Sequence, residues 1–302
     1  MKKKLIDLSI ITVTYNHQHE IVKNLQALLR ALSLYQAHFI IIDNASTDST
    51  VSRIQSMQSA LAAQHLFTLI KNKTNVGFTK AVNQGLAQCC SQYILILNPD
   101  TQLFPATLPP LIKFLELHQA CGIVSPQFLN LDGSIQASCR RFPRHRDLLF
   151  LAVGLDKLFS QSKIFNHWKM GDFDFRSLQK VDQPQGAFLL THRTAVKQVG
   201  MWDEKFPMFF SDVDWCRRFI AKGWEIFFLP DVQIVHDKGT SIHRNRLQMI
   251  WSSHRSFYDY FKKYYPGKIW QFINLLTAGL LILMAILRSL FLVLTTSYWE
   301  IK

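Results

Sequence analysis

The first hundred residues alternate between short apolar runs and stretches with helical periodicity. The apolar runs are rich in β-branched residues and end in polar clusters, which is typical of buried strands. We therefore expect strands at residues 8–13, 39–42, 67–70 and 93–97. We expect helices over residues 20–34, over residues 78–89 and up to about Met57, the last of these capped by Ser46 or Thr47. Strands that alternate with helices predict a parallel sheet with right-handed crossovers.

The second half of the chain has a less regular pattern. Asp132-Gly133, inside residues 128–138, predicts a hairpin. We expect further strands at residues 186–191, 225–229 and 232–235. We expect helices from Arg193 onward and over residues 212–221, with Gly223 ending the second. Residues 148–182 are aromatic and mixed in charge, and no element is assigned to them.

Polar clusters follow each of the four strands in the first half. They are Thr14-Tyr15-Asn16, Asp43-Asn44, Asn75-Val76-Gly77 and Asn98-Pro99-Asp100. The carboxyl ends of parallel strands meet at one edge of a sheet, and ligands of such sheets bind beyond that edge. The four clusters therefore predict a single ligand site.

The most apolar segment lies at the end of the chain. Between Ile269 and Trp299 the one formal charge is Arg288. A membrane span needs about 20 apolar residues, and this stretch is long enough. Arg288 inside a span would cost about 2.5–3.5 kcal/mol on insertion scales. Two membrane arrangements remain open: a single span with Arg288 snorkelling or paired, and a hairpin or in-plane helix that keeps it near the headgroups.

The alternative without a membrane is a buried core helix or a dimer interface. Residues 258–268, just before the apolar segment, mix lysines with tyrosines. An anionic membrane interface attracts such a mixture, which favours membrane association.

The composition joins a positive net charge to a high apolar content. The 302 residues include 34 Lys and Arg against 21 Asp and Glu, a net charge of +13. The mean hydropathy is +0.05. A hydrophobic fraction of 48% allows a sizeable core and excludes a disordered or collagen-like chain. The excess positive charge predicts an anionic partner, which could be nucleic acid, a lipid surface or a phosphorylated substrate.

The cysteines and the start of the chain indicate a reducing compartment. The five cysteines have neither a CxxC pair nor zinc-site spacing. Asp7 and the polar residues after Val13 interrupt any signal-peptide hydrophobic region, so we expect a cytoplasmic catalytic part.

The sequence lacks both common phosphate-binding loops. No GxGxxG or Walker A pattern lies between the predicted strands and helices. A nucleotide-using enzyme then needs another way to neutralise the diphosphate, and a divalent metal held by a carboxylate is a standard one. Asp100 directly follows a strand, and Pro99 fixes the turn before it. Taken alone, this turn would more often be structural.

An ordered set of motifs resembles the family 2 glycosyltransferases, specifically their rhamnosyltransferase-like branch. The matching segments begin at Ile11, Ile42, Asn75, Leu97, Gly186, Gly200, Ser211 and Val235, and the resemblance extends over residues 8–265. It implies a GT-A fold, which is an α/β, Rossmann-like fold with a mostly parallel central sheet. We expect this domain over residues 1–266, with a nucleotide-binding half at 1–100 and an acceptor-binding half at 101–266. A hydrophobic membrane-associating tail follows at 267–302.

The resemblance also implies a donor site. In it, Asp43 accepts a hydrogen bond from the pyrimidine base, and Gly77 lets the backbone approach the nucleotide. Asp100 binds a divalent metal, Mg²⁺ or Mn²⁺, that bridges the diphosphate, and His236 completes the metal shell. The remaining donor contacts are Thr14, Tyr15, Asn16, Asn75, Asn83 and Asn98.

A carboxylate at the start of a predicted helix matches the family's catalytic base. Inverting transfer needs one carboxylate beside the acceptor hydroxyl, and Asp212 occupies that position. Ser211 stands where the family often has Glu, so a second carboxylate's help is missing there. Asp214 would orient the acceptor or stabilise the helix N-terminus. The apolar residues 208–210 beside Asp212 favour a raised pKa through desolvation.

The acceptor is expected to be a polyprenyl-diphosphate-linked saccharide. Basic residues between Arg140 and Arg146 follow the predicted hairpin and could be a solvated surface patch. Beside a membrane they would engage lipid phosphates or the acceptor's diphosphate. The expected acceptor contacts are Arg140 and Arg141 of this basic cluster, together with Trp202 and Asp214. No nucleic-acid module is recognised, so nucleic acid is not expected as a partner.

The resulting hypothesis is an inverting, metal-dependent glycosyltransferase on the cytoplasmic face of the cell membrane, peripheral or anchored by its tail. It would move a sugar, rhamnose for instance, from a dTDP- or UDP-linked donor to a lipid-linked acceptor in surface polysaccharide biosynthesis. One alternative is a nucleotidyltransferase, although residues 16–19 offer no Lys or Arg for a triphosphate. Another is a catalytically silent membrane adaptor that only binds a nucleotide sugar.

Overall fold

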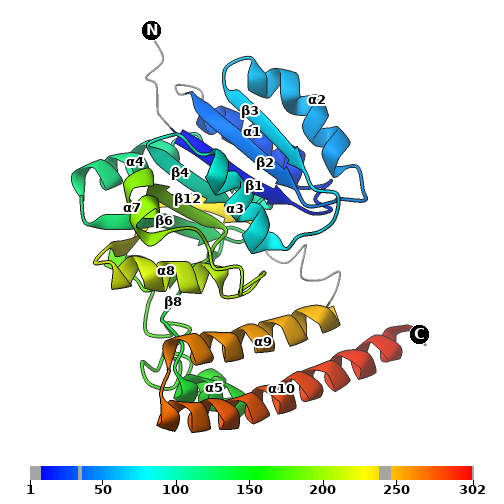
Figure 1. The fold of residues 1–302 in the computed structure, drawn as a ribbon, viewed down its shortest axis with the longest axis vertical. Helices are drawn as coiled ribbons and strands as arrows, with labels where there is room; N and C mark the ends of the chain where they lie inside the picture. Colours follow the sequence, from blue (N-terminus) through cyan, green and yellow to red (C-terminus); the bar gives the residue numbers. More distant parts are fainter. Residues whose placement is uncertain (1–7, 33–35, 238–245, 301–302) are drawn as a thin grey trace.

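The computed structural model describes residues 8–32, 36–237 and 246–300. Figure 1 shows an α/β body with two long helices lying side by side below it. The main sheet has ten strands. Its path runs β3-β2-β1-β4-β11-β6-β12-β5, with β7 paired to β6 and β9 paired to β12.

The first four strands form the parallel part of the sheet. They are β1 (Leu8–Thr14), β2 (Ala37–Asp43), β3 (Leu66–Lys71) and β4 (Tyr93–Leu97). Strand β1 lies between β2 and β4 and is parallel to both. Every residue of β1 and β4 is buried, as expected for strands covered on both faces. The polar clusters that follow these strands therefore meet at one edge.

Beyond β4 the sheet becomes mixed. Its strands are β5 (Thr101–Leu103), β6 (Cys121–Leu129), β7 (Ile135–Gln136), β9 (Gln179–Lys180), β11 (Phe188–His192) and β12 (Glu225–His236). Strand β11 is antiparallel to its neighbours β4 and β6, whereas β12 is parallel to β6. A separate small sheet pairs β8 (Cys139–Arg140) with β10 (Gln183–Pro184). The predicted α/β fold with a largely parallel central sheet is confirmed.

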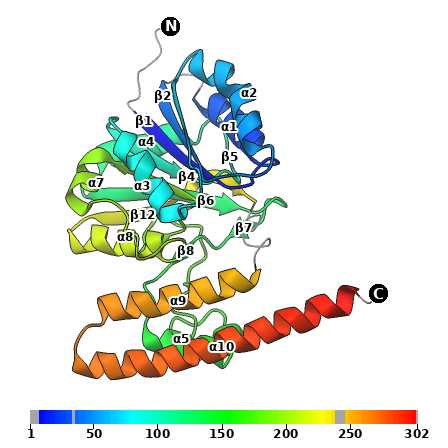
Figure 2. The ribbon, with the colours of Figure 1, turned by 45° about the vertical axis from the view of Figure 1, so that its right-hand side comes forward.

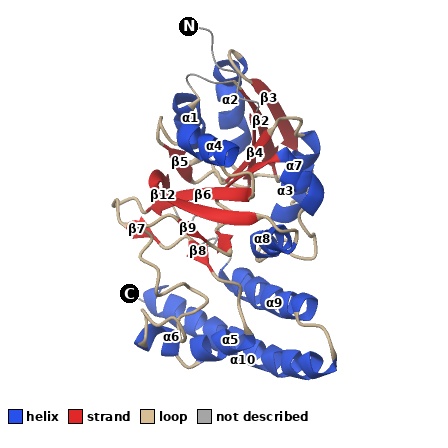
Figure 3. Cartoon of the chain, turned by 90° about the vertical axis from the view of Figure 1, so that its left-hand side faces the viewer, coloured by secondary structure: helices blue, strands red, loops and turns tan. Residues whose placement is uncertain are grey.

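Helices cover both faces of the sheet (Figures 1 and 3). One face packs against α1 (Ile21–Ala31), α2 (Thr50–Ala62) and α4 (Leu108–Leu117). The other face packs against α3 (Phe78–Gln88), α7 (Arg193–Val199) and α8 (Ser211–Ala221). The carboxyl edge lies between these two layers and stays open for a ligand.

A further layer lies under α8, on the side away from the sheet (Figure 2). It contains α5 (His145–Ala152), α6 (Leu155–Leu158), α9 (Arg246–Tyr264) and α10 (Lys268–Glu300). Its core joins Phe210 and Val213, near the start of α8, to Phe257, Phe261 and other aromatic residues of α9. Helix α9 therefore lies between the α/β body and α10.

The structure changes several details of the predicted elements. Helix α2 begins at Thr50, whose backbone N–H donates to Asp48 Oδ1, while Ser46 donates to Asp43 and caps nothing. The two strands predicted between residues 225 and 235 form one strand, β12, with an irregularity between Leu229 and Gln233. Helices α4 and α9 had no predicted counterpart. The hairpin at Gly133 is confirmed by the antiparallel pairing of β6 and β7.

Candidate active site

A cavity of about 360 Å³ opens at the carboxyl edge of the parallel strands. Its walls come from the end of β1, the turn after β4, the segment before β11, the start of α8 and the end of β12. The lining residues are Val13, His17, Phe78, Asn98, Pro99, Asp100, Gln185, Gly186, Ala187, Met208, Phe209, Phe210, Ser211, Asp212 and His236. The cavity thus brings together Asn98, Asp100, Asp212 and His236, which the sequence placed in one site.

Asp100 and His236 face each other across two neighbouring strands. Asp100 lies in the turn between β4 and β5, and His236 is the last residue of β12, paired in register with Thr101 of β5. Asp100 Oδ1 lies 3.5 Å from His236 Nε2. Both residues are nine-tenths or more buried.

The tautomer of His236 follows from its second contact. His236 Nδ1 lies 2.7 Å from Gln136 Oε1, and the Gln136 amide nitrogen donates to Asn130 Oδ1 and to the His236 carbonyl. An amide oxygen only accepts, so Nδ1 carries a proton, and in the neutral ring Nε2 then has the lone pair. That lone pair points toward Asp100 Oδ1, a buried oxygen without a hydrogen-bond partner in the described residues.

This pair fits a divalent cation. Two acceptor atoms that face each other need a proton or a cation between them, and carboxylate and imidazole are both metal ligands. Within residues 8–32, 36–237 and 246–300, no group of three or more His, Cys, Asp or Glu side chains is arranged to hold a metal. Magnesium commonly binds through one or two protein ligands together with substrate phosphates and water. The pair therefore suits a metal held jointly with a diphosphate.

Asp212 lines the same cavity, at the start of α8. Its Oδ2 accepts hydrogen bonds from the Gly186 N–H at 2.9 Å and from Gln183 Nε2 at 3.0 Å, and its Oδ1 accepts from the Val213 N–H at 2.9 Å. Burial raises the pKa of Asp212, while these N–H donors act in the opposite direction. A carboxylate held by neutral donors keeps its ability to take up a proton.

Gly186 gives this contact room. A Cβ at Gly186 would lie 3.2 Å from the Cβ of Asp212 and 3.3 Å from its Oδ2. A side chain at this position would therefore press on the Asp212 carboxylate and shift it by a few tenths of an ångström.

The clusters after β1 and β2 are joined through Asp43. Asp43 Oδ1 accepts from Thr14 Oγ1 at 3.0 Å and from the Ser46 hydroxyl, and Oδ2 accepts from the Ser46 N–H. Asn16 has a positive φ of 57°, and its Oδ1 accepts from the Thr47 N–H at 2.7 Å. Tyr15 is exposed. These residues adjoin the cavity through their neighbours Val13 and His17, which line it.

The loop after β3 is held by amide side chains. Asn44 Nδ2 donates to Asn75 Oδ1 at 2.8 Å, and Asn75 Oδ1 also accepts from the Gly77 N–H. Gly77 has φ +88° and packs against Pro207, so the backbone here needs glycine. The next residue, Phe78, lines the cavity.

The structure places Asn83 and Trp202 away from the cavity. Asn83 Nδ2 donates to the Trp202 carbonyl, and Asn83 Oδ1 accepts from the Trp202 N–H, both at 3.0 Å. The Trp202 side chain is 2% exposed and packs against Phe78 and Trp215. This reciprocal pair fixes a loop against α3 and gives neither residue a surface for donor or acceptor.

Asp214 faces away from Asp212 and is fully buried. Its carboxylate receives Arg218 Nε at 2.8 Å, Lys263 Nζ and the Tyr264 hydroxyl at 2.6 Å. Lys263 and Tyr264 belong to α9. Asp214 therefore links α8 to α9, which accounts for its position without an acceptor.

The basic residues after the hairpin are largely engaged within the protein. Arg141 forms a bidentate pair with Asp172, at 2.6 and 2.8 Å, and Arg144 pairs with Asp147. Arg140 donates to the Ala137 and Cys139 carbonyls and pairs in register with Gln183, which contacts Asp212. Burial lowers the pKa of Arg140. Of these arginines, Arg140 is the one adjoining the catalytic wall.

Sequence reasoning missed several contributors to the site. Gln136 orients His236, Gln183 and Gly186 hold Asp212, and His17 and Gln185 line the cavity. Gly186 begins one of the segments that resemble the family, so the sequence did offer a signal for it. Gln136 and Gln183 lie on two-residue strands whose pairing no local pattern predicts.

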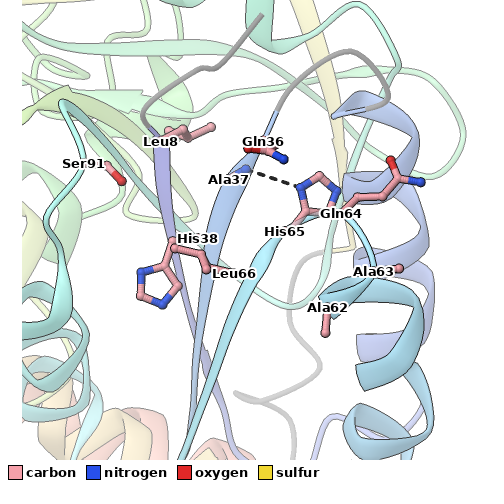
Figure 4. A pocket seen from close by; sticks show the side chains of 10 residues that line it. All are labelled: Leu8, Gln36, Ala37, His38, Ala62, Ala63, Gln64, His65, Leu66 and Ser91. Carbon is pink, nitrogen blue, oxygen red and sulfur yellow. Dashed lines mark hydrogen bonds between the residues drawn. The ribbon is translucent and has the colours of Figure 1, made fainter. Parts of the chain in front are cut away.

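A second cavity of about 420 Å³ lies at the opposite edge of the same strands (Figure 4). It is lined by the amino ends of β1 and β2, by the end of α2 and by His65, whose Nδ1 accepts from the Ala37 N–H at 3.3 Å. No carboxylate lines this cavity. It therefore lacks the carboxylate–histidine pair of the active-site cavity.

The fold and the carboxylate–histidine cavity define the GT-A class of nucleotide-sugar transferases. The model of the family described as "Glycosyl transferase family 2" matches residues 9–161, which is half of the chain. The chain belongs to this family, and it is a glycosyltransferase.

Two relatives extend the match over most of the chain. The chain is 25% identical, over 86% of its length and 85% of the relative's, to the N-acetylglucosaminyl-diphospho-decaprenol L-rhamnosyltransferase of Mycobacterium tuberculosis. It is 24% identical, over 75% of its length and 82% of the relative's, to rhamnosyltransferase WbbL of Escherichia coli. The resemblance to the rhamnosyltransferase-like branch is confirmed.

Solved structures show the same fold. The mannosyltransferase PcManGT from Pyrobaculum calidifontis, in complex with GDP-Man and Mn²⁺, covers 98% of this chain and 81% of its own, at a TM-score of 0.58 and 17% identity. Staphylococcus aureus TarS matches at a TM-score of 0.53 and 16% identity. The match covers 81% of this chain and 39% of TarS.

Proposed function

We propose that the chain transfers rhamnose from a dTDP-linked donor to a polyprenyl-diphosphate-linked saccharide, with inversion and with a divalent metal. The observation that carries this proposal is one cavity lined both by a carboxylate–histidine pair and by a carboxylate held by neutral donors. The names of the mycobacterial and E. coli relatives support the sugar, and that of the mycobacterial relative supports the lipid carrier.

Asp212 acts as the general base. It takes the proton from the acceptor hydroxyl as the oxygen attacks the anomeric carbon, and the nucleoside diphosphate leaves from the opposite face. Its raised pKa brings the carboxylate closer to working pH, where a base is most effective. Gly186 and Gln183 hold its Oδ2, and Val213 holds its Oδ1.

Asp100 and His236 hold the donor's diphosphate side. A divalent metal bound there would neutralise the charge that develops on the leaving diphosphate. Gln136 keeps His236 in the tautomer whose Nε2 lone pair faces Asp100. Asn98 lies beside this pair in the same cavity.

The base and ribose lie along the clusters after β1, β2 and β3. Asp43 Oδ2 accepts one hydrogen bond within the protein, so it retains acceptor capacity for the pyrimidine N–H. Thr14 and Ser46 hold Asp43 in place, and exposed Tyr15 offers a ring for the base.

The chain works at a membrane surface, with residues 1–266 as its catalytic domain. In the described part of the chain, α10 is the one helix long and apolar enough to cross a bilayer, and thirteen of its large apolar side chains are exposed. An in-plane position suits it better than a span, because α10 runs beside α9 and Arg288 lines a cavity against that helix (Figure 2).

The direct test supplies the full chain with dTDP-rhamnose or a UDP-sugar and with polyprenyl-diphosphate N-acetylglucosamine in detergent. We expect a lipid-linked disaccharide from dTDP-rhamnose and a metal. Treatment with EDTA should abolish the product, and Mg²⁺ or Mn²⁺ should restore it. Transfer that persists in EDTA would exclude the metal role of Asp100 and His236.

Two other outcomes would favour the alternative functions. Release of pyrophosphate from a nucleoside triphosphate and a sugar phosphate would indicate a nucleotidyltransferase. Tight binding of a nucleotide sugar without turnover in any acceptor mixture would indicate an adaptor.

A further inference from the structure

A cavity of about 630 Å³ lies between α9 and α10, outside the active site. Four of its nine lining residues come from α9, four come from α10, and the ninth is Phe209. Most of the lining is apolar, with Ile250 and Phe291 among it. We call this space the α9–α10 groove.

Phe209 lies between the α9–α10 groove and the active-site cavity. The same ring lines the catalytic cavity together with Asp212, Asp100 and His236. Phe209 is half-buried and lies three residues before the base. A molecule that fills the groove and passes Phe209 therefore arrives beside Asp212.

The charge of the α9–α10 groove is positive. Arg246 and Arg288 are its charged lining residues, and no Asp or Glu lines it. Arg288 forms no ion pair in the described residues, and it also lines an adjoining cavity with Lys157 and Lys169. Asp156 in that adjoining cavity is already paired with Lys169 at 2.6 Å. A guanidinium without a protein partner suits a phosphate.

A second cavity between the same helices provides the contrast. It has a volume of about 650 Å³ and is lined by Ser252, Arg255 and Ile282, among others. It shares no residue with the catalytic cavity. Its arginine, Arg255, is paired with Asp259 at 2.9 Å. Of these two cavities, the α9–α10 groove is the one in which an arginine, Arg288, has no ion pair in the described residues. It is also the one that shares a lining residue, Phe209, with the active-site cavity.

We propose that the α9–α10 groove binds the isoprenoid diphosphate of the acceptor, with the chain along Ile250 and Phe291, the diphosphate at Arg288 and the sugar past Phe209 at Asp212. This inference rests on the proposed function, since it presumes a lipid-linked acceptor. It resolves the position of Arg288 within an apolar helix, because the guanidinium faces the groove and its anionic ligand.

The test compares two pairs of matched variants of the full chain. Arg288→Gln and Ser253→Trp alter the α9–α10 groove, the second by filling it. Arg255→Gln and Ser252→Trp make the same substitutions in the second cavity. Binding of farnesyl diphosphate, which has the isoprenoid and the diphosphate and no sugar, is measured directly. The KM for polyprenyl-diphosphate N-acetylglucosamine is measured in parallel.

We expect Arg288→Gln and Ser253→Trp to weaken farnesyl diphosphate binding and to raise the acceptor KM by about tenfold or more. The first substitution removes a charge-assisted hydrogen bond, and the second fills the groove. Arg255→Gln and Ser252→Trp should match the unaltered chain. Equal effects in both pairs, or an equal loss of donor affinity in Arg288→Gln, would overturn the assignment.

The binding arm keeps this inference separate from the proposed function. If farnesyl diphosphate binds at Arg288 and no sugar is transferred from a nucleotide sugar, the groove assignment is supported and the proposed reaction is wrong. If transfer occurs and the groove variants behave as the controls do, the groove assignment is wrong. Phosphatidylglycerol vesicles supply the other source of lipid phosphate. Loss of vesicle binding in Arg288→Gln, with farnesyl diphosphate binding unchanged, would also refute it.

Discussion

The two sides of α8 hold their carboxylates in different ways. On the cavity side, Asp212 receives only neutral N–H groups, from Gly186, Gln183 and Val213. On the α9 side, Asp214 receives two cations and a tyrosine hydroxyl. Neutral donors position a carboxylate and leave it able to accept a proton. The two aspartates therefore differ in role: Asp214 links α8 to α9, and we expect Asp212 to serve the reaction.

The largest expected effect is the loss of the base. Asp212→Asn should lower transfer by about 10²- to 10⁴-fold, the usual contribution of general base catalysis. Donor binding should persist, because the diphosphate site that we propose at Asp100 and His236 is left intact. Initial rates and a donor titration measure both quantities. Turnover at the original rate would exclude Asp212 as the base.

The next effect concerns the orientation of His236. Gln136→Leu removes the acceptor for the Nδ1 proton, and we expect the metal concentration needed for half-maximal activity to rise about 10- to 100-fold. Excess metal should restore most of the rate. Gln233→Leu is a control, since Gln233 lies on β12 like His236 but contacts Gln127 of β6. A loss that no metal concentration reverses would contradict this role for Gln136.

The contacts of Asp214, on the α9 side of α8, predict an effect on stability. Asp214→Asn leaves Lys263 and Arg218 without their carboxylate, and we expect unfolding to become easier by about 1–3 kcal/mol. The estimate is below that for a fully buried pair because both cations are partly exposed. Thermal or denaturant unfolding measures it. A large loss of turnover in a fully folded variant would instead place Asp214 in the reaction.

The smallest effect is a shift in the pH profile. Asp212 works in its charged form, so the rate should fall as the pH is lowered through its raised pKa. Gln183→Leu removes a donor that stabilises the charged form, which should raise the pKa of Asp212 further and move the acidic limb to higher pH. Rates across a pH series test this. A limb that moves to lower pH would contradict the assignment of the limb to Asp212.

The first half of the fold was predictable because its signals are local. Each buried strand is a short apolar run that ends in a polar cluster, and β4 was predicted with its exact bounds, Tyr93–Leu97. The same logic located Asp100, and the resemblance located Asp212 and His236. All three line one cavity.

The rest of the site depends on contacts between distant residues. Gln136 and His236 are 100 residues apart in the sequence, and Gly186 and Asp212 are 26 apart. The short strands β8 and β10 pair with each other across about 40 residues of sequence, and runs of two residues are too short for a periodicity to be detected. Trp202 was predicted at the acceptor because its segment matched the family motif, yet burial places it in the core.

The backbone conformation at Phe210 also determines the shape of the cavity wall, which Phe210 lines. Phe210 has φ +68°, a left-handed conformation that costs a bulky residue about 1–3 kcal/mol and persists only where surrounding packing enforces it. That packing comes from α9, since the Phe210 ring lies 4.4 Å from Phe257 and 5.3 Å from Tyr260, centroid to centroid. The neighbouring Phe209 divides the active site from the α9–α10 groove. Packing against α9 therefore holds Phe209 and Phe210 in place. A displacement of α9 on the membrane would move this wall of the active-site cavity.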